Sequence, residues 1–178
     1  MTDRTPVTLT VNGETVSHHV APRDTLADFL RQTLQLTGTH LGCEMGACGA
    51  CLVLLDDKPI HACLMFAVQA DGMVIETIEG LDGRGAISDL QQAFHQRNSL
   101  QCGFCTAGVL VTSYHLLKTG QTASREEIRD GLSGNYCRCT GYEAIVDAIE
   151  TVARQREAGS DRPKNRPMDR PMSEEVGA

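Results

Sequence analysis

Four closely spaced cysteines constrain the fold of this chain more than any other feature of its sequence. Cys43, Cys48 and Cys51 stand in a C-x4-C-x2-C pattern, and Cys63 follows a short distance along the chain. Thiolates are soft, anionic ligands suited to transition metals. Two glycines lie between the first three cysteines, and glycine allows the tight turns and exposed N–H groups that a loop around an anionic centre needs. The stretch 42–51 is therefore predicted to wrap a metal site.

This spacing is typical of a plant-type [2Fe–2S] centre, in which four thiolates fill the iron positions that the bridging sulfides leave open. A zinc site and a redox-active pair at Cys48 and Cys51 are the alternatives. The x4 spacing with its glycines disfavours zinc, and a lone redox pair would not need Cys43. We interpret the stretch as an iron–sulfur loop.

Composition limits the other functions open to the chain. The 178 residues have a net charge of −7 and 4% aromatic residues, which argues against a nucleic-acid partner. The first residues are polar and charged, unlike a signal peptide, and no apolar run approaches the roughly 20 residues of a transmembrane segment. We therefore expect a cytoplasmic protein, in which thiols stay reduced and available to iron.

The first half of the chain predicts a small sheet. Residues 7–11 alternate with a period of two, and Asn12-Gly13 favours a type I′ hairpin turn into a strand at 14–20. Asp24 or Thr25 can cap a helix that Gly38 ends, and a second hairpin at 52–63 and a last strand at 73–78 follow. Together they predict an α+β domain over residues 1–80, consistent with the β-grasp of plant-type ferredoxins.

The second half predicts helices. After a turn-rich joint at 79–85, capping signals precede four apolar helical patterns, and these signals lie at Ser88, Thr106, Ser124 and Thr140. Four short helices imply a four-helix bundle over residues 81–157, with Tyr136 packed inside it. Residues 158–178 are rich in Pro, Arg, Asp and Ser and predict a disordered tail.

A second set of four cysteines lies in the helical half. Cys102 and Cys105 form a CxxC pair, and Cys137 and Cys139 form a CxC pair. Two of them directly precede the predicted caps of helices, whose partly positive N-termini stabilise anionic sulfur. A structural zinc ion would be stabilised there too, so this geometry leaves iron and zinc open.

Both cysteine patterns resemble those of one enzyme family. Residues 101–108 and 134–142 resemble the second-cluster signatures of the xanthine oxidase family of molybdenum hydroxylases, and residues 42–63 resemble its first-cluster signature. The resemblance covers about residues 7–155. It implies the free-standing small iron–sulfur subunit, with the molybdenum and flavin sites on separate chains.

The resemblance implies an electron relay without an active site on this chain. Electrons would come from molybdopterin on a large subunit, pass singly through two [2Fe–2S] clusters, and reach FAD on a medium subunit. The cluster nearer molybdenum would be held by Cys102, Cys105, Cys137 and Cys139. The cluster nearer the flavin would be held by Cys43, Cys48, Cys51 and Cys63. Gln101 and Cys139 match the positions that approach the pterin.

Two other functions remain as alternatives. A diffusible ferredoxin would explain the first cysteine set but not the helical half, and a zinc-binding interaction module would have no redox role. The substrate is not readable, because its pocket would lie on a partner. Carbon monoxide, N-heterocycles, aldehydes and aromatic acyl-CoA thioesters all stay open, as do the final electron acceptor and the assembly of the complex.

Overall fold

A hairpin at the Asn12-Gly13 turn starts the sheet, as predicted. The structure is a computed structural model that describes residues 4–159. Strands β1 (Thr5–Val11) and β2 (Glu14–Val20) pair antiparallel. Asn12 and Gly13 have φ angles of 52° and 86°, which is the left-handed backbone that a type I′ turn requires.

The sheet has five strands in the order β2-β1-β5-β3-β4, and β1 and β5 are its parallel pair. The other strands are β3 (Leu52–Leu55), β4 (Lys58–His61) and β5 (Val74–Glu76). Helix α1 (Leu26–Asp28) continues into a π-helical segment (Phe29–Thr33), and its apolar face is buried. The mixed sheet with its packed helix confirms the α+β prediction.

Two boundaries in this half differ from the predictions. Thr25 caps the first helix, because its hydroxyl accepts the Asp28 N–H at 3.1 Å, but the helical turns end at Thr33, before Gly38. The segment predicted as a turn-rich joint is helix α2 (Ile78–Gly83). Asn12 explains how this helix starts, because its side-chain oxygen accepts the N–H of Thr77, directly before the helix, at 2.8 Å.

The four predicted helices of the second half are all present. They are α3 (Ser88–Gln96), α4 (Thr106–Thr119), α5 (Arg125–Gly131) and α6 (Glu143–Gly159). Ser124 caps α5 as predicted, since its hydroxyl accepts the Glu127 N–H at 3.2 Å. Ser88 does not cap α3: it is the first helical residue, and its hydroxyl donates to the Gly85 carbonyl instead.

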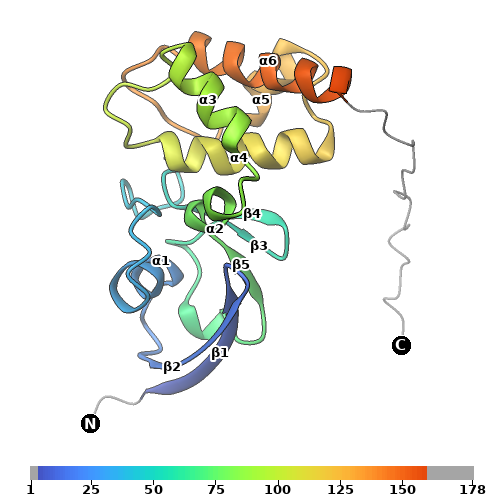
Figure 1. The fold of residues 1–178 in the computed structure, drawn as a ribbon. Helices are drawn as coiled ribbons and strands as arrows, with labels where there is room; N and C mark the ends of the chain where they lie inside the picture. The colour runs from blue at the N-terminus through green and yellow to red at the C-terminus, as the bar shows by residue number, and fades with distance from the viewer. Residues whose placement is uncertain (1–3, 160–178) are drawn as a thin grey trace, which may run out of the picture.

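The helical half stacks on the sheet through α4, as Figure 1 shows, and strand β3 belongs to both cores. Leu52 and Leu54 pack into the helical core, whereas Val53 between them packs into the sheet core. This alternation follows from the period of two along a strand. The division after residue 80 therefore remains a prediction, and the predicted tail at 158–178 lies almost wholly outside the described residues.

A 3-10 turn (Ala67–Ala70) lies between β4 and β5. Within residues 4–159, no helix combines the length and the hydropathy needed to span a membrane.

Candidate iron–sulfur sites

The first cysteine set lies where the loop 42–51 meets the β3–β4 hairpin. Cys51 directly precedes β3 and Cys63 closely follows β4, so the pairing of these strands brings the two cysteines together. Both are buried, with exposed fractions of 2% and 8%. Cys43 and Cys48 lie nearer the surface and are half-buried. The fold therefore gathers all four predicted ligands at one end of the sheet.

Backbone amides point at the outer sulfur of this set. The N–H groups of Ala47 and Cys48 donate to the Cys43 Sγ at 3.4 and 3.3 Å. Hydrogen bonds from the Met45 amide, first, and then from Cys48 and Ala47 lower the pKa of Cys43 to about 7. Donors directed at one sulfur stabilise its thiolate form, which is the form that binds metal.

At the buried end of the first set, the pKa of the cysteine thiol is raised instead of lowered. Burial, and then the neighbouring thiols of Cys63 and Cys48, raise the pKa of Cys51 to about 12. A buried thiol crowded by other thiols stays protonated unless a cation joins them, because a coordinated thiol loses its proton outright. This chemistry fits a site for a cationic metal centre.

The second cysteine set is assembled from two loops of the helical half. The Sγ atoms of Cys102 and Cys139 lie 3.7 Å apart, and both residues are exposed. Cys105 is more deeply placed, and burial, followed by the neighbouring Cys137 and Cys102 thiols, raises its pKa to about 12. All four predicted ligands therefore adjoin one another.

Thr140 holds the sulfur of Cys137. Burial would raise the pKa of Cys137, but hydrogen bonds to its Sγ, from the Thr140 hydroxyl at 3.1 Å and the Thr140 amide at 3.5 Å, lower it overall. Thr140 was predicted to cap the last helix directly after Cys139. That prediction is wrong, because α6 begins at Glu143 and Thr140 faces a cysteine sulfur instead.

Cys105, rather than Thr106, occupies the cap position of α4. Thr106 is the first helical residue, and its N–H bonds the Gly103 carbonyl at 3.1 Å. The predicted position of one ligand at a helix N-terminus is therefore right, with a shift of one residue.

The two sets can be compared with single-metal and two-metal sites. Within the described residues, no three His, Cys, Asp or Glu side chains are arranged around a point where one metal ion would bind. A [2Fe–2S] cluster does not need its four thiolates around a single point, because they are shared between two irons. Four thiols in each set, with amide donors at their sulfurs, fit such a cluster.

Gln101 lies at the exposed edge of the second set. Its side-chain amide donates to the Cys139 carbonyl at 3.0 Å, so it links the two loops that hold these cysteines. The two bonded residues are 38 positions apart in the sequence. The bond uses one of the two N–H donors of the amide and leaves its oxygen exposed for other contacts.

The two cysteine loops touch each other, which sequence reasoning did not anticipate. The Tyr136 N–H donates to the Cys48 carbonyl at 2.8 Å, and Tyr136 directly precedes Cys137. The Tyr136 ring was predicted to pack inside the bundle, but the residue is 60% exposed. Its backbone, rather than its ring, makes the structural contact.

An aromatic pair also joins the loops. The rings of His40 and Phe104 stack with centroids 4.9 Å apart, and Nδ1 of His40 lies 2.8 Å from the Phe104 carbonyl. A carbonyl only accepts hydrogen bonds, so this contact places the proton of His40 on Nδ1. No local pattern signals the pair, because its partners are 64 residues apart.

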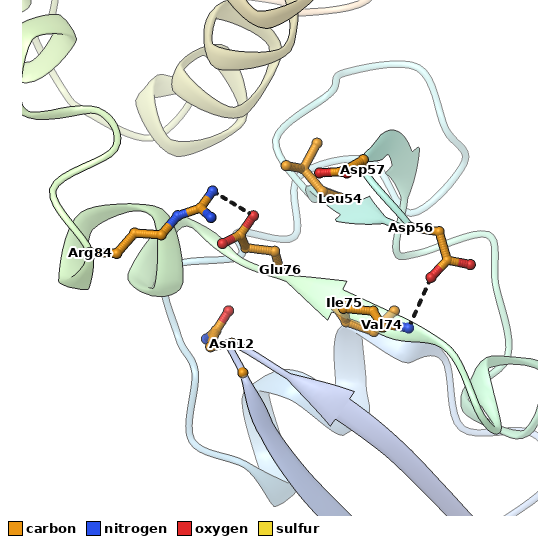
Figure 2. Close-up of a pocket in the computed structure, with 9 residues that line it drawn as sticks. Asn12, Leu54, Asp56, Asp57, Val74, Ile75, Glu76 and Arg84 are labelled. Atoms are coloured by element: carbon orange, nitrogen blue, oxygen red, sulfur yellow. Dashed lines mark hydrogen bonds and ion pairs between the residues drawn. The ribbon is translucent and has the colours of Figure 1, made fainter.

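A hollow of about 460 Å³ lies away from the cysteines, where the sheet meets α2. Figure 2 shows Arg84 extending into it towards Glu76, with the two charges 2.9 Å apart. Arg84 also donates to the Tyr114 hydroxyl on α4 at 3.0 Å. Arg84 therefore connects β5 of the sheet to α4 of the helical half.

Two family models match the chain. Residues 9–74 match a "2Fe-2S iron-sulfur cluster binding domain", and residues 77–150 match a "[2Fe-2S] binding domain". The two matched regions contain the first and the second cysteine set, respectively.

Curated relatives match most of their own length. The chain is 51% identical to caffeine dehydrogenase subunit gamma of Pseudomonas sp. (strain CBB1), over 83% of this chain and 90% of that one. It is 48% identical to the nicotine 6-hydroxylase small subunit of Paenarthrobacter nicotinovorans, over 83% and 88% of the two chains.

A solved structure has the same fold. A chain of quinoline 2-oxidoreductase from Pseudomonas putida 86 superposes with a TM-score of 0.80 at 46% identity. The match covers 88% of this chain and 98% of that one.

Proposed function

This chain belongs to the small [2Fe–2S] subunits of the xanthine oxidase family of molybdenum hydroxylases, and from that membership we propose its ligands, partners and substrate class. It is the electron-transfer subunit of a heteromeric molybdenum-dependent oxidoreductase. Molybdopterin and FAD belong to other subunits of such complexes, so catalysis takes place outside this chain.

The proposed ligands are the eight cysteines in their two sets. Cys43, Cys48, Cys51 and Cys63 hold one cluster, and Cys102, Cys105, Cys137 and Cys139 hold the other. A bound [2Fe–2S] cluster supplies one-electron redox chemistry. The chain's own contribution is to donate hydrogen bonds to the ligand sulfurs, since Ala47 and Cys48 donate to Cys43 and Thr140 donates to Cys137. Such donors favour the thiolate and tune the potential of a cluster.

The proposed partners are a large molybdopterin-binding subunit beside the second set and a medium FAD-binding subunit beside the first. Large apolar side chains are exposed beside both sets, with Met45 and Leu64 at the first and Leu100 and Tyr136 at the second. Exposed apolar groups that surround a functional site are typical of protein contact surfaces. Gln101 and Cys139, both exposed, face the molybdopterin subunit in this arrangement.

An N-heterocycle is the proposed substrate class of the whole complex. The relatives with 46–51% identity are named for caffeine, nicotine and quinoline, which are all N-heterocycles. We place the complex in the cytoplasm, where a reducing environment keeps eight unpaired cysteines available to iron.

The observation that supports this function most directly is the assembly of two complete four-cysteine sets. Metal and sulfide analysis of the purified complex tests it, and we expect about four irons and four inorganic sulfides per chain, two of each for every cluster. Replacing Cys139 by Ser should remove about half of the iron and leave the first cluster's spectrum unchanged. Zinc in place of iron, or a chain that purifies without large partners, would contradict the assignment.

A further inference from the structure

A buried asparagine links the two cysteine loops. Asn135 lies two residues before Cys137 and is 2% exposed. Its side-chain oxygen accepts a hydrogen bond from the Thr112 hydroxyl of α4 at 2.8 Å, and its side-chain nitrogen donates to the Gly49 carbonyl at 3.4 Å. One side chain therefore joins the second cysteine loop, a helix of the bundle and the first cysteine loop.

The backbone of Asn135 is held as firmly as its side chain. Its N–H donates to the Leu132 carbonyl at 2.8 Å, and its carbonyl accepts the Tyr142 hydroxyl at 3.0 Å. Each of its four polar groups thus has a partner. A buried polar network that is fully satisfied fixes one arrangement of its members, because any shift would leave a buried group unpaired.

The packing at this point is backbone against backbone. Gly49 has a φ angle of 72°, and a Cβ on it would lie 2.3 Å from the Gly134 carbonyl oxygen. On the other side, a Cβ on Gly108 would lie 2.0 Å from the Gly49 carbonyl oxygen. At both points the nearest atom is a backbone oxygen, which cannot move aside by a change of rotamer.

The same contact lies next to a ligand of each set. Cys48 precedes Gly49, and Cys137 follows Tyr136, whose N–H bonds the Cys48 carbonyl. A displacement of Asn135 would therefore move a ligand of the second set relative to a ligand of the first. Functional groups need their supporting residues fixed to within about 0.5 Å to keep a productive geometry.

We propose that Asn135, held in place by Thr112, is a positioning residue that sets the separation and relative orientation of the two [2Fe–2S] clusters. The proposal rests on the proposed function, since it requires both clusters on this chain. Asn135 acts through the two loops that contain Cys48 and Cys137. The rate of electron transfer between two centres falls steeply with their separation, so the network acts on the rate of transfer between the clusters.

The test compares three single variants in the assembled complex. Thr112→Val keeps the shape of the side chain but removes the hydroxyl donor to Asn135. Thr112→Ser keeps the hydroxyl and removes only a methyl group. Ser113→Ala is the matched control, because Ser113 is also buried on the same helix, but its hydroxyl donates to the Val109 carbonyl within that helix at 2.7 Å.

The readout is the magnetic coupling between the clusters in the dithionite-reduced complex, measured as the spin–spin splitting of their electron paramagnetic resonance signals. We expect Thr112→Val to change or lose this splitting and to slow transfer from the second cluster to the first several-fold. Thr112→Ser and Ser113→Ala should retain the wild-type splitting and rate. An unchanged splitting in Thr112→Val at full iron content would overturn the proposal, as would an equal loss in Ser113→Ala or in Thr112→Ser.

Iron content separates this proposal from the function on which it rests. A wild-type complex without two clusters would refute the ligand assignment itself, whereas full iron with an unaltered splitting refutes only the positioning role. If Thr112→Val loses iron, hydrogen exchange of the backbone amides decides. Faster exchange confined to residues 48–50 and 134–137 supports the proposal, and faster exchange throughout the helical half overturns it.

Discussion

Adding one methyl group at Gly108 should destabilise the chain where its two halves meet. Gly108 lies in the first turn of α4, and alanine is ordinarily the better residue in a helix by about 1 kcal/mol. Here the added Cβ would lie 2.0 Å from the Gly49 carbonyl oxygen and 3.2 Å from the Ala50 Cα. Helix propensity and packing therefore predict opposite signs for the same substitution.

The packing cost should prevail. The closest neighbour is a backbone atom, so relief requires the cysteine loop to move by about 1 Å before a Cβ reaches the 3.0 Å that real contacts need. Inserting a methyl group into a filled site costs about 1–3 kcal/mol. A loop fixed by Cys48, Cys51 and the Asn135 bond yields little, which favours the upper end of that range. After the gain in propensity, we expect a net loss of about 2 kcal/mol in the free energy of unfolding.

Thermal unfolding of the purified chain, followed by circular dichroism and by visible absorbance, measures this loss. A chain of this size loses about 2–4 °C in Tm per kcal/mol, so Gly108→Ala should unfold about 4–8 °C below wild type. Gly83→Ala is the matched control, because Gly83 ends α2 and a Cβ there would meet nothing within 4 Å. Its Tm should stay close to that of wild type. A Tm of Gly108→Ala equal to or above the wild-type value would show that α4 does not rest on the cysteine loop.

Two further predictions concern Gln101, beside the second cysteine set, and Asp89, which pairs with Arg156 between α3 and α6. Gln101→Ala should keep both clusters and slow their reduction by substrate, but not by dithionite, because it removes the bond to the Cys139 carbonyl at the edge proposed to face molybdopterin; equal substrate-driven rates in rapid-mixing absorbance would contradict this. Burial acts to raise the pKa of Asp89, but the hydrogen bonds and charge of Arg156, together with backbone donors such as the Leu90 N–H, lower it overall. The folded chain therefore binds the Asp89 proton less tightly than the unfolded chain does. The pair stabilises α3 against α6 above the unfolded pKa near 3.8, so the Tm difference between wild type and Asp89→Asn should shrink as the pH falls through the lowered pKa; a constant difference would refute the role of the pair.

Sequence patterns correctly predicted the turns and helix caps that neighbouring residues form. The Asn12-Gly13 turn, the Thr25 cap and the Ser124 cap are each made by residues within a few positions of one another, and the structure contains all three. The cysteine spacing likewise grouped the eight cysteines into two sets of four, and the structure brings the members of each set together. Side chains that bind backbone groups two or three residues away leave their pattern in the sequence.

Two of the wrong predictions arose where a side chain made a contact that the local pattern does not contain. Glycines at 80, 83 and 85 suggested a turn-rich joint, but Asn12, 65 residues before Thr77, holds the start of α2. Thr140 has the sequence of a helix cap, but its hydroxyl contacts the Cys137 sulfur. In the first case a distant side chain overrode the local preference. In the second case the Thr140 hydroxyl contacts a thiol only three residues away, and helix propensity includes neither contact.

The approach of the two cysteine loops lay furthest beyond prediction, and it bears most directly on the proposed relay. The Asn135–Gly49 bond spans 86 residues, and no periodicity or spacing relates its partners. The sequence nevertheless contains a trace of the contact, which is a glycine in the first turn of α4, where alanine would favour the helix. A locally unfavourable residue marks a place where the global structure has a stronger requirement. Here that requirement is the close packing of α4 on Gly49, which lies between two successive proposed ligands, Cys48 and Cys51. This packing joins the helical half to the loop of the first cysteine set.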